Sequence, residues 1–293
     1  MKKFLVFAML GMMPYINSTA QIYEIISSET IESYKQFNEG FGVFRSKTGK
    51  YGFVNEKRKI VIPAIYDDAD HFLSGRAKVK LDGKYGFIDT LGNTITQCKY
   101  DATGSFVSYH YGHTFVSINN KYGFINYDGK EITDLKYSSA TNGFNKLGLA
   151  SVQFNGKWGL IDTSGKEITS FKYDNVIGFS VEVPLAQVQI GNKWGYIDNS
   201  GNEVIPCIYE RASTFHHGIA CVIFNGKIGF IDKCGKIIIP FKYDRESDHQ
   251  RFTSVNKYGI YFDKVLLNGK SIYIDLKGNE YQTWEEVNKV VEK

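Results

Sequence analysis

The sequence predicts an all-β fold made of about seven tandem repeats, each 34–37 residues long and each a three-stranded β-meander. Three observations lead to this prediction. A short phrase of about six residues recurs at a nearly constant spacing. A stretch of alternating apolar and polar residues precedes each copy of the phrase, and a two-residue turn pattern lies between that stretch and the phrase. A fixed period of this length is typical of propellers, solenoids and similar repeat arrays.

The recurring phrase reads Lys, an aromatic residue (Ile228 in the sixth copy), Gly, a large apolar residue, Ile or Val, and usually Asp. Its glycines are Gly52, Gly86, Gly123, Gly159, Gly195 and Gly229, spaced by 34, 37, 36, 36 and 34 residues. A seventh copy at residues 270–275 has Ile272 in place of the glycine. Chance does not explain so many copies, so the period reflects the fold.

Two strands and a tight turn form the first part of each repeat. In residues 77–81, Ala, Val and Leu alternate with two Lys, which is the pattern of a half-buried strand. The pair Asp82-Gly83 then favours a two-residue hairpin, because both residue types tolerate positive φ. The phrase itself is the second strand. Its two faces are both apolar, so a neighbouring repeat must cover each of them.

The second part of each repeat is a turn and a short third strand. The turn has the pattern Asp-x-x-Gly, as in Asp162 to Gly165, where the Asp side chain caps backbone amides and Gly takes a left-handed conformation. A short strand such as residues 167–169 follows. Three copies then have a proline, which suits a strand end or an edge strand. The proline residues are Pro63, Pro206 and Pro240.

A tyrosine closes each repeat, usually with Asp after it. The tyrosines are Tyr66, Tyr100, Tyr137, Tyr173, Tyr209 and Tyr243. The Tyr-Asp segment is the candidate for a fourth, short strand. Stacked meanders of this kind favour a β-propeller-like arrangement. An open β-superhelix or solenoid is the alternative, since propeller blades usually have four strands and about 40 residues or more.

The pattern Gly-Lys-Trp-Gly-x-Ile-Asp-x-x-Gly-Lys, continued to Pro and Tyr-Asp, resembles the WG-repeat family of bacterial exported proteins, also called KWG repeats. The resemblance covers roughly residues 49–281, although the Trp is present only at Trp158 and Trp194. It implies export and a role in protein interaction. It implies no catalytic residue, because the shared positions are structural.

The chain is expected to have four parts. Residues 1–20 have the layout of a secretory signal peptide: Lys2 and Lys3, an apolar run of ten residues, and small residues before Gln21. Residues 21–40 are a lead-in segment and residues 41–281 form the repeat domain. Residues 282–293 form a tail with a short amphipathic helix, which places Trp284, Val287 and Val291 near one face.

This organisation predicts an exported protein, periplasmic or extracellular, with no stable membrane span after cleavage. The apolar run is shorter than the about 20 residues that a spanning helix needs, and no second run is longer. The net charge of +4 falls to +2 when the two Lys of the signal peptide are removed (4 − 2 = 2). The basic residues are scattered, so nucleic acid is not an expected partner.

Metal and cofactor sites are not expected. Each Asp-x-x-Gly turn supplies one carboxylate, whereas a Ca²⁺ site needs six or more oxygens. The four cysteines form no CxxC pair, which argues against a zinc site. Small apolar core residues are the simplest interpretation of the four cysteines, and their disulfide status stays open. The six histidines lie in the irregular segments between repeats, where solvated loop residues are expected.

The best candidate for a binding site is the loop at residues 105–115. A long loop on a rigid β scaffold is a common place for function. Four of its side chains combine aromatic rings with imidazoles, and a second histidine pair lies in the equivalent segment of a later repeat. The binding candidates are Tyr109, His110, Tyr111, His113, His216 and His217.

The sequence therefore predicts a non-catalytic repeat protein that offers an interaction or scaffold surface in the cell envelope, with an envelope or extracellular protein as partner. No catalytic motif is present. The alternative is a carbohydrate-binding or cell-wall-binding module, or a weak glycan-active enzyme. A glycan-active enzyme needs a pair of carboxylates, and the sequence does not single out such a pair.

Overall fold

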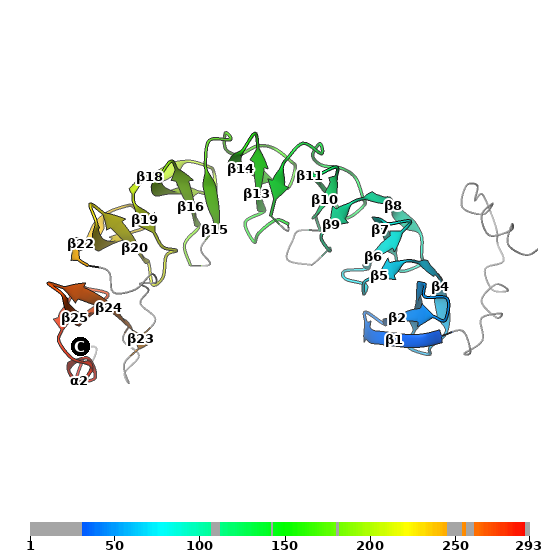
Figure 1. Ribbon diagram of the computed structural model, residues 1–293, viewed down its shortest axis with the longest axis horizontal. Coiled ribbons are helices and arrows are strands. Elements are labelled where there is room, and N and C mark those ends of the chain that lie inside the picture. The colour runs from blue at the N-terminus through cyan, green and yellow to red at the C-terminus, as the bar shows by residue number, and fades with distance from the viewer. Residues whose placement is uncertain are drawn as a thin grey trace, which may run out of the picture. The chain divides into compact units, whose positions relative to one another are not determined.

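The computed structural model describes residues 31–106, 112–141, 143–179, 182–244, 254–255 and 261–290. These residues confirm the all-β prediction (Figure 1). The chain divides into two compact units. The first contains the residues up to 120 together with 125–131, and the second contains residues 121–124 together with those from 132 onward.

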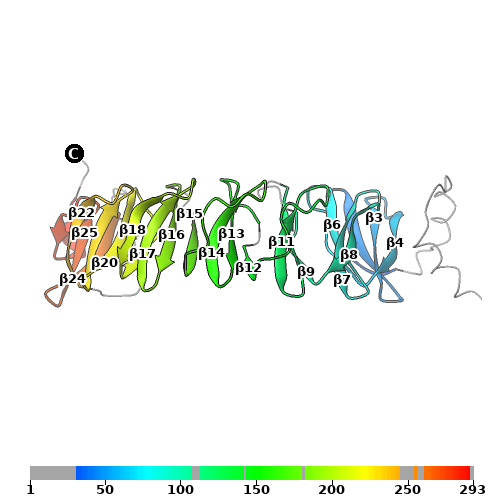
Figure 2. The same cartoon turned by 90° about the horizontal axis from the view of Figure 1, so that it is seen from above.

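The first unit contains two four-stranded antiparallel sheets, which lie side by side in Figures 1 and 2. The first sheet has the order β1 (Ile31–Asn38), β2 (Phe41–Ser46), β3 (Tyr51–Asn55) and β4 (Ile60–Tyr66). The second has the order β5 (Asp68–Ala69), β6 (Arg76–Leu81), β7 (Lys84–Asp89) and β8 (Thr94–Tyr100). A further pair follows, β9 (Ala102–Thr103) with β10 (Thr114–Ile118). The division between the units falls within β11 (Lys121–Ile125).

The second unit repeats the same plan in order along the chain. Its first sheet contains β12 (Ser139–Ala140), β13 (Leu149–Phe154) and β14 (Lys157–Asp162). The next contains β15 (Asn175–Phe179), β16 (Leu185–Ile190), β17 (Lys193–Asp198) and β18 (Glu203–Tyr209). It is followed by β19 (Arg211–Ala212), β20 (Ile219–Phe224), β21 (Lys227–Asp232) and β22 (Ile237–Tyr243). The last sheet contains β23 (Ser254–Val255), β24 (Tyr261–Leu267), β25 (Lys270–Asp275) and β26 (Glu280–Tyr281).

The predicted hairpins form as expected. β6 pairs with β7 without a register shift, and the turn between them has Asp82 at φ 50° and Gly83 at φ 78°. Two consecutive positive φ values are the requirement of a type I′ turn, which matches the twist of the flanking strands. Asn155 and Gly156 make the same turn between β13 and β14.

The glycine inside the second strand allows a close backbone approach. A Cβ atom at Gly86 would lie 2.7 Å from the carbonyl oxygen of Thr96 and 2.9 Å from the backbone nitrogen of Cys98. The ladder between β7 and β8 shifts register across this point, between Tyr85 and Phe87, and again between Phe87 and Ile88. A side chain there would push β8 away, so the glycine is a structural requirement of the bulge.

Most sheets contain a fourth strand that a three-stranded meander lacks. Directly after Tyr66-Asp67, the two residues of β5 pair with β6, Asp68 opposite Lys80 and Ala69 opposite Val79. The Tyr-Asp segment therefore does supply a short strand, and that strand belongs to the sheet of the next repeat. β1 has this position in the first sheet, so the first sheet begins within the lead-in segment 21–40.

The core lies between consecutive sheets, as the apolar faces of the second strands predict. In the first unit, Val43 and Phe53 of the first sheet pack with Val79 of the second and with Phe72. Of the repeated tyrosines, Tyr100, Tyr137, Tyr173 and Tyr243 are fully buried. Within each unit, neighbouring sheets are thus stabilised by burying apolar faces against one another, as in other repeat proteins.

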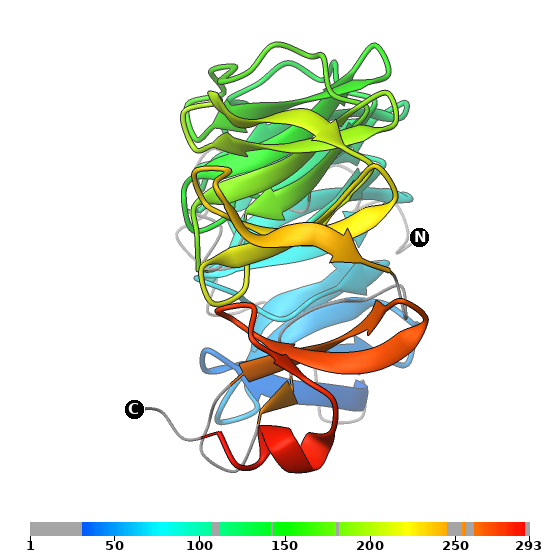
Figure 3. The ribbon, with the colours of Figure 1, turned by 90° about the vertical axis from the view of Figure 1, so that its left-hand side faces the viewer.

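The predicted tail helix exists but is short. α2 (Trp284–Val287) is capped by Thr283, whose hydroxyl accepts a hydrogen bond from the backbone N–H of Glu286. Val287 is buried, and the Trp284 ring lies 5.2 Å from the Tyr273 ring, measured between centroids. Figure 3 shows α2 against the last sheet. Residue 291, predicted on the same face, lies outside the described residues.

Candidate interaction site

The carboxylates of the Asp-x-x-Gly turns are occupied by their own turns. Asp89 Oδ1 accepts hydrogen bonds from the backbone N–H groups of Leu91 at 2.9 Å and Asn93 at 2.8 Å. Partial desolvation raises the pKa of Asp89, but the hydrogen bonds outweigh it and the pKa lies below its ordinary value. The described residues contain no group of three His, Cys, Asp or Glu side chains arranged to hold a metal ion.

An acid follows five of the six core tyrosines, and the acids after Tyr100 and Tyr173 link one repeat to the next. Lys157 donates to Asp174 Oδ1, and the backbone N–H of Gly191, at the tip of the next hairpin, donates to Asp174 Oδ2 at 2.8 Å. The hydrogen bond from Lys157 is the largest cause that lowers the pKa of this carboxyl. Asp101 is held in the same way by Lys84 and the backbone of Asn119. These polar residues therefore hold the fold together.

A second link joins the Lys that precedes four of the six core tyrosines to a Glu in the next repeat. Lys136 lies 3.0 Å from Glu167, measured from Nζ to Oε1. The other pairs are Lys99 with Glu131 at 2.9 Å, Lys172 with Glu203 at 3.9 Å and Lys242 with Glu280 at 2.7 Å. The Tyr243 hydroxyl also donates to Glu280 at 2.7 Å.

At one junction of the second unit, apolar side chains replace this ion pair. Ile208 stands where four other repeats have the Lys, and Ile237 stands where the repeats after those four have the Glu. The first repeat has Ile65 at the Lys position, and Thr94 stands at the Glu position of the repeat after it. Ile208 is 43% exposed and Ile237 is 52% exposed, and Val204 of β18 is exposed as well. We call Val204, Ile208 and Ile237 the apolar patch. At this junction isoleucine replaces both members of the ion pair, whereas at the junction after the first repeat the pair is replaced by Ile65 and Thr94.

The candidates chosen from the sequence fall into three groups. Tyr109, His110 and Tyr111 lie outside the described residues. His113 is half-buried at the end of the same loop, in the first unit. His216 and His217 belong to the second unit, where the structure brings them together with two residues that sequence reasoning missed.

These two additional residues are Glu182 and Tyr261. His216 Nε2 lies 3.1 Å from the Thr214 hydroxyl, and His216 Nδ1 lies 3.8 Å from Glu182 Oε1. The backbone N–H of His217 donates to Glu182, and the His217 ring lies 3.7 Å from the Tyr261 ring, measured between centroids. Glu182 therefore joins two loops, as Glu39 does in the first unit by accepting from the backbone N–H groups of Ser74 and Gly75.

The four cysteines are free thiols. Cys98, Cys207 and Cys221 are half-buried, whereas Cys234 is exposed in a turn, so the interpretation as core residues is wrong for Cys234. Desolvation raises the pKa of Cys98 and of Cys207. A raised pKa keeps a thiol protonated, so these two cysteines are poor nucleophiles.

Several solved structures are similar to this chain at low TM-scores. The crystal structure of BamB from Moraxella catarrhalis has 10% identity and a TM-score of 0.31, covering 86% of this chain and 84% of BamB. Apo AztD from Citrobacter koseri has 13% identity and a TM-score of 0.35, covering 85% of this chain and 82% of AztD. The designed protein Ika8 has 9% identity and a TM-score of 0.35, with coverages of 87% and 88%. These TM-scores support no statement about function, and no curated protein matches the sequence.

The family described as "WG containing repeat" matches six consecutive stretches of the chain. They are residues 51–85, 85–122, 122–158, 158–194, 194–227 and 228–245. Each of the first five runs from one phrase to the next and contains one core tyrosine. Residues 85–122, 158–194 and 194–227 also contain a complete Asp-x-x-Gly turn. The match covers well over half of the chain, and the protein therefore belongs to the WG-repeat family.

Proposed function

We propose that the chain is an exported, non-catalytic repeat protein that offers a protein-interaction surface in the cell envelope, either periplasmic or extracellular. The observation that carries the proposal is the apolar patch. The polar residues that recur in the repeats are engaged in contacts between or within repeats, so they build the scaffold. The residues available to a partner are those that depart from the repeat, and Ile208 and Ile237 depart from it together.

The patch favours recognition through side chains. β18 and β22 each end a sheet order, and each contains an exposed proline, Pro206 and Pro240, which cannot donate a ladder hydrogen bond. Strand addition by a partner is therefore disfavoured at these edges. Burial of exposed isoleucine under a partner contributes about 25 cal/mol for each Å² of apolar surface removed from water. An envelope or extracellular protein with an apolar surface of its own is the partner that fits.

The test is capture of partners from envelope extract by the tagged chain and by a variant with Ile208→Lys and Ile237→Glu. This variant installs the ion pair of four other junctions, so it removes the patch with little effect on the fold. The matched control is Lys136→Glu with Glu167→Lys, which keeps a pair of opposite charges at another junction. Proteins retained by the wild type and the control but lost by the Ile208/Ile237 variant support the proposal. Equal retention by all three contradicts it.

Export is tested separately. The support is the signal-peptide pattern of residues 1–20, which lie outside the described residues. The described residues also contain no helix with the length and apolar character that a membrane span needs. N-terminal sequencing of the protein recovered from the envelope or medium should begin at Gln21. A protein that keeps Met1 and remains in the cytoplasm would contradict export.

A further inference from the structure

The first unit contains a cavity that the repeat contacts do not use. It lies between the end of β1 and the segment that follows β5. The residues that line it are Gln36, Phe37, Asn38, Asp70, His71 and Leu73. Its volume is about 310 Å³. This is the lower end of the range of about 300–1,000 Å³ that is typical of ligand pockets, so it suits one small ring.

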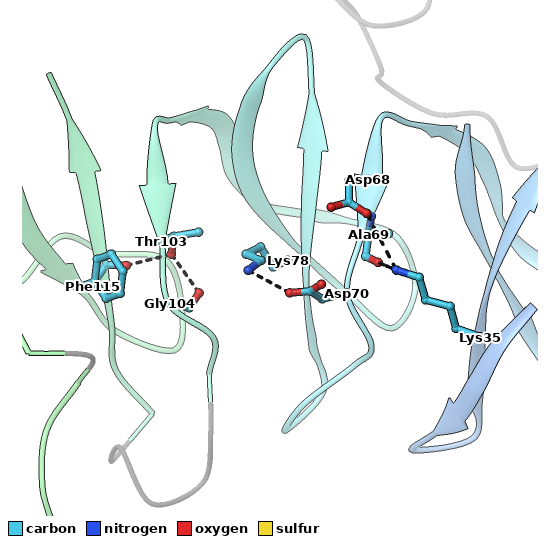
Figure 4. A network of polar contacts seen from close by, with 8 residues as sticks. All are labelled: Lys35, Asp68, Ala69, Asp70, Lys78, Thr103, Gly104 and Phe115. Carbon is cyan, nitrogen blue, oxygen red and sulfur yellow. Dashed lines mark hydrogen bonds and ion pairs between the residues drawn. The ribbon is translucent and has the colours of Figure 1, made fainter. Parts of the chain in front are cut away.

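Both walls of the cavity are held in place by hydrogen bonds between the two segments. The Asn38 side-chain amide donates to the carbonyl oxygen of Phe72 at 2.6 Å. Lys35 Nζ donates to the carbonyl oxygen of Ala69 at 3.1 Å, as Figure 4 shows. The Glu39 carboxylate holds the backbone N–H groups at the far end of the loop. The cavity is therefore formed before any ligand arrives, which lowers the entropic cost of binding.

An aromatic ring forms one side of the cavity. Phe37 is 36% exposed, although it belongs to a sheet. Its ring rests against Gly42 of β2, where a Cβ atom would lie 2.8 Å from the ring. The glycine leaves room for the ring at the cavity, and Leu73 adds a second apolar group.

The polar groups of the cavity can form hydrogen bonds but have no uncompensated charge. The Asp70 carboxylate is paired with Lys78 at 2.9 Å, and Lys35 is paired with Asp68 at 3.9 Å (Figure 4). The Gln36 amide both donates and accepts. Among the described residues, His71 Nδ1 is a buried polar atom without a hydrogen-bond partner, which is rare in native proteins. A ligand with hydrogen-bonding groups and no net charge fits these walls.

We propose that this cavity binds a single neutral sugar ring. Hydroxyl groups both donate and accept, so they match an amide, a carboxylate and an imidazole together. The C–H face of a sugar ring is apolar and can lie on Phe37. Cations fit less well because Asp70 is already paired with Lys78, and anions fit less well because neither Lys nor Arg is among the described residues that line the cavity.

The experiment measures binding to the purified chain by ligand-observed NMR and by calorimetry. The probes are glucose, galactose, mannose and N-acetylglucosamine, with inorganic phosphate and glycinamide as charged comparisons. Saturable binding of at least one sugar, stronger than that of both charged probes, is expected. Absence of binding by all four sugars, or stronger binding of a charged probe, overturns the proposal.

Variants locate the binding. Phe37→Ala should weaken it by at least about tenfold, because the apolar face of the ring loses its contact. Gly42→Ala should also weaken it by displacing the Phe37 ring, while every polar group stays in place. The matched control is Tyr34→Ala, which removes an equally exposed aromatic ring of β1 that does not line the cavity, and sugar binding should persist. Binding that survives Phe37→Ala in a folded protein, or that Tyr34→Ala removes equally, overturns the assignment.

Discussion

Two third-strand regions of the second unit have similar sequences but different structures. Residues 203–209 form the continuous strand β18. Residues 167–173 have the same place in the preceding repeat, yet they pair only through two isolated bridges, Ile161 with Glu167 and Trp158 with Tyr173. Both regions begin with Glu and end with a core tyrosine, so the difference arises between these ends.

The residues in the middle explain the difference. In residues 167–173 the hydroxyl of Thr169 accepts from the backbone N–H of Leu160 at 2.9 Å, and the N–H of Lys172 turns back to the carbonyl oxygen of Ser170 at 3.1 Å. This bond between backbone groups two residues apart takes the N–H of Lys172 out of the ladder. β8 has the same threonine position, Thr96, followed by Gln and Cys, and it remains a strand. Threonine alone therefore does not interrupt the strand, and the residues after it decide the outcome.

The residue at the position of Thr169 also determines how closely the turn of the next repeat approaches. Each Asp-x-x-Gly turn packs on the third strand of the preceding repeat. A Cβ atom at Gly165 would lie 2.2 Å from the carbonyl oxygen of Ile132, whereas one at Gly235 would lie 3.4 Å from the side chain of Ile205. A Cβ atom at Gly129 would lie 2.8 Å from the carbonyl oxygen of Ile95, next to Thr96 in the continuous strand β8, so the interruption itself is not the cause. An Ile side chain thus separates the repeats, and the Thr-containing strands let the turn reach the backbone.

The largest effect is expected from Gly165→Ala compared with Gly235→Ala. Both glycines have φ above 80°, so each Ala is expected to cost about 1–2 kcal/mol in backbone strain. Gly165→Ala also forces Cβ into a backbone carbonyl, and we expect a total loss of about 3–5 kcal/mol. Urea denaturation of both variants measures the difference. Equal losses would show that the close approach at Gly165 is relieved without cost.

The next effect concerns Thr169→Val, which keeps the shape and removes the hydroxyl. The N–H of Leu160 then loses its acceptor inside the core, and we expect a loss of about 1–3 kcal/mol. Amide hydrogen exchange at Leu160 should accelerate together with the loss of stability. Ile205→Val is the control at the continuous strand, where no N–H is left unpaired and the exchange at Tyr196 should change little. Unchanged exchange at Leu160 would contradict the assigned hydrogen bond.

A smaller effect is expected from pH at the junction of Lys242 with Glu280. The hydrogen bond from Lys242, followed by that from Tyr243, lowers the pKa of Glu280. A lowered pKa in the folded state contributes stability above the unfolded pKa, and this contribution is lost as pH falls through the folded value. Glu280→Gln should therefore differ from the wild type at pH 7 and converge with it in acid. Denaturation midpoints between pH 7 and pH 3 test this, and a constant difference would contradict it.

The smallest effect is expected at the apolar patch itself. Ile208→Lys with Ile237→Glu should change the free energy of unfolding by no more than about 1 kcal/mol, because both positions are exposed and an exposed ion pair contributes little. Denaturation checks this value. A large loss would mean that the isoleucines stabilise the junction, and the capture experiment would then need Ile208→Ser as a milder change.

The sequence predicts those features that depend on local chemistry. The Asp82-Gly83 hairpin and the Asp89 cap each involve residues a few positions apart, so their patterns suffice. The sequence did not predict that residues 167–173 fail to form a continuous strand. This outcome depends on weak backbone preferences of Ser170 and Phe171, whereas the Glu and Tyr at the ends of the region are the same as in β18. The apolar patch was missed because no single repeat is unusual there. A position-by-position comparison of neighbouring repeats, Lys with Glu against Ile208 with Ile237, would have found it.

The site predictions show the same limit. A cluster such as Glu182 with His216 joins side chains from different repeats, and an irregular loop has no period from which to infer its partner. The cavity at Phe37 joins residues about one repeat apart, and its key neighbour, Gly42, looks like an ordinary strand glycine. The role of Tyr109, His110 and Tyr111 in binding stays a prediction, because these residues lie outside the described residues.

The short first strand of each sheet has a consequence for how such a chain can lengthen or shorten. β5 and β19 follow the core tyrosine of one repeat but belong to the next sheet. A sequence repeat that is counted from one phrase to the next therefore begins in the middle of one sheet and ends in the middle of the next sheet. Duplication or deletion of one period conserves every sheet when both cuts fall at equivalent positions. Exchange of a single sheet between two such proteins requires cuts directly after the tyrosine, and cuts at the phrase would join half of one sheet to half of another.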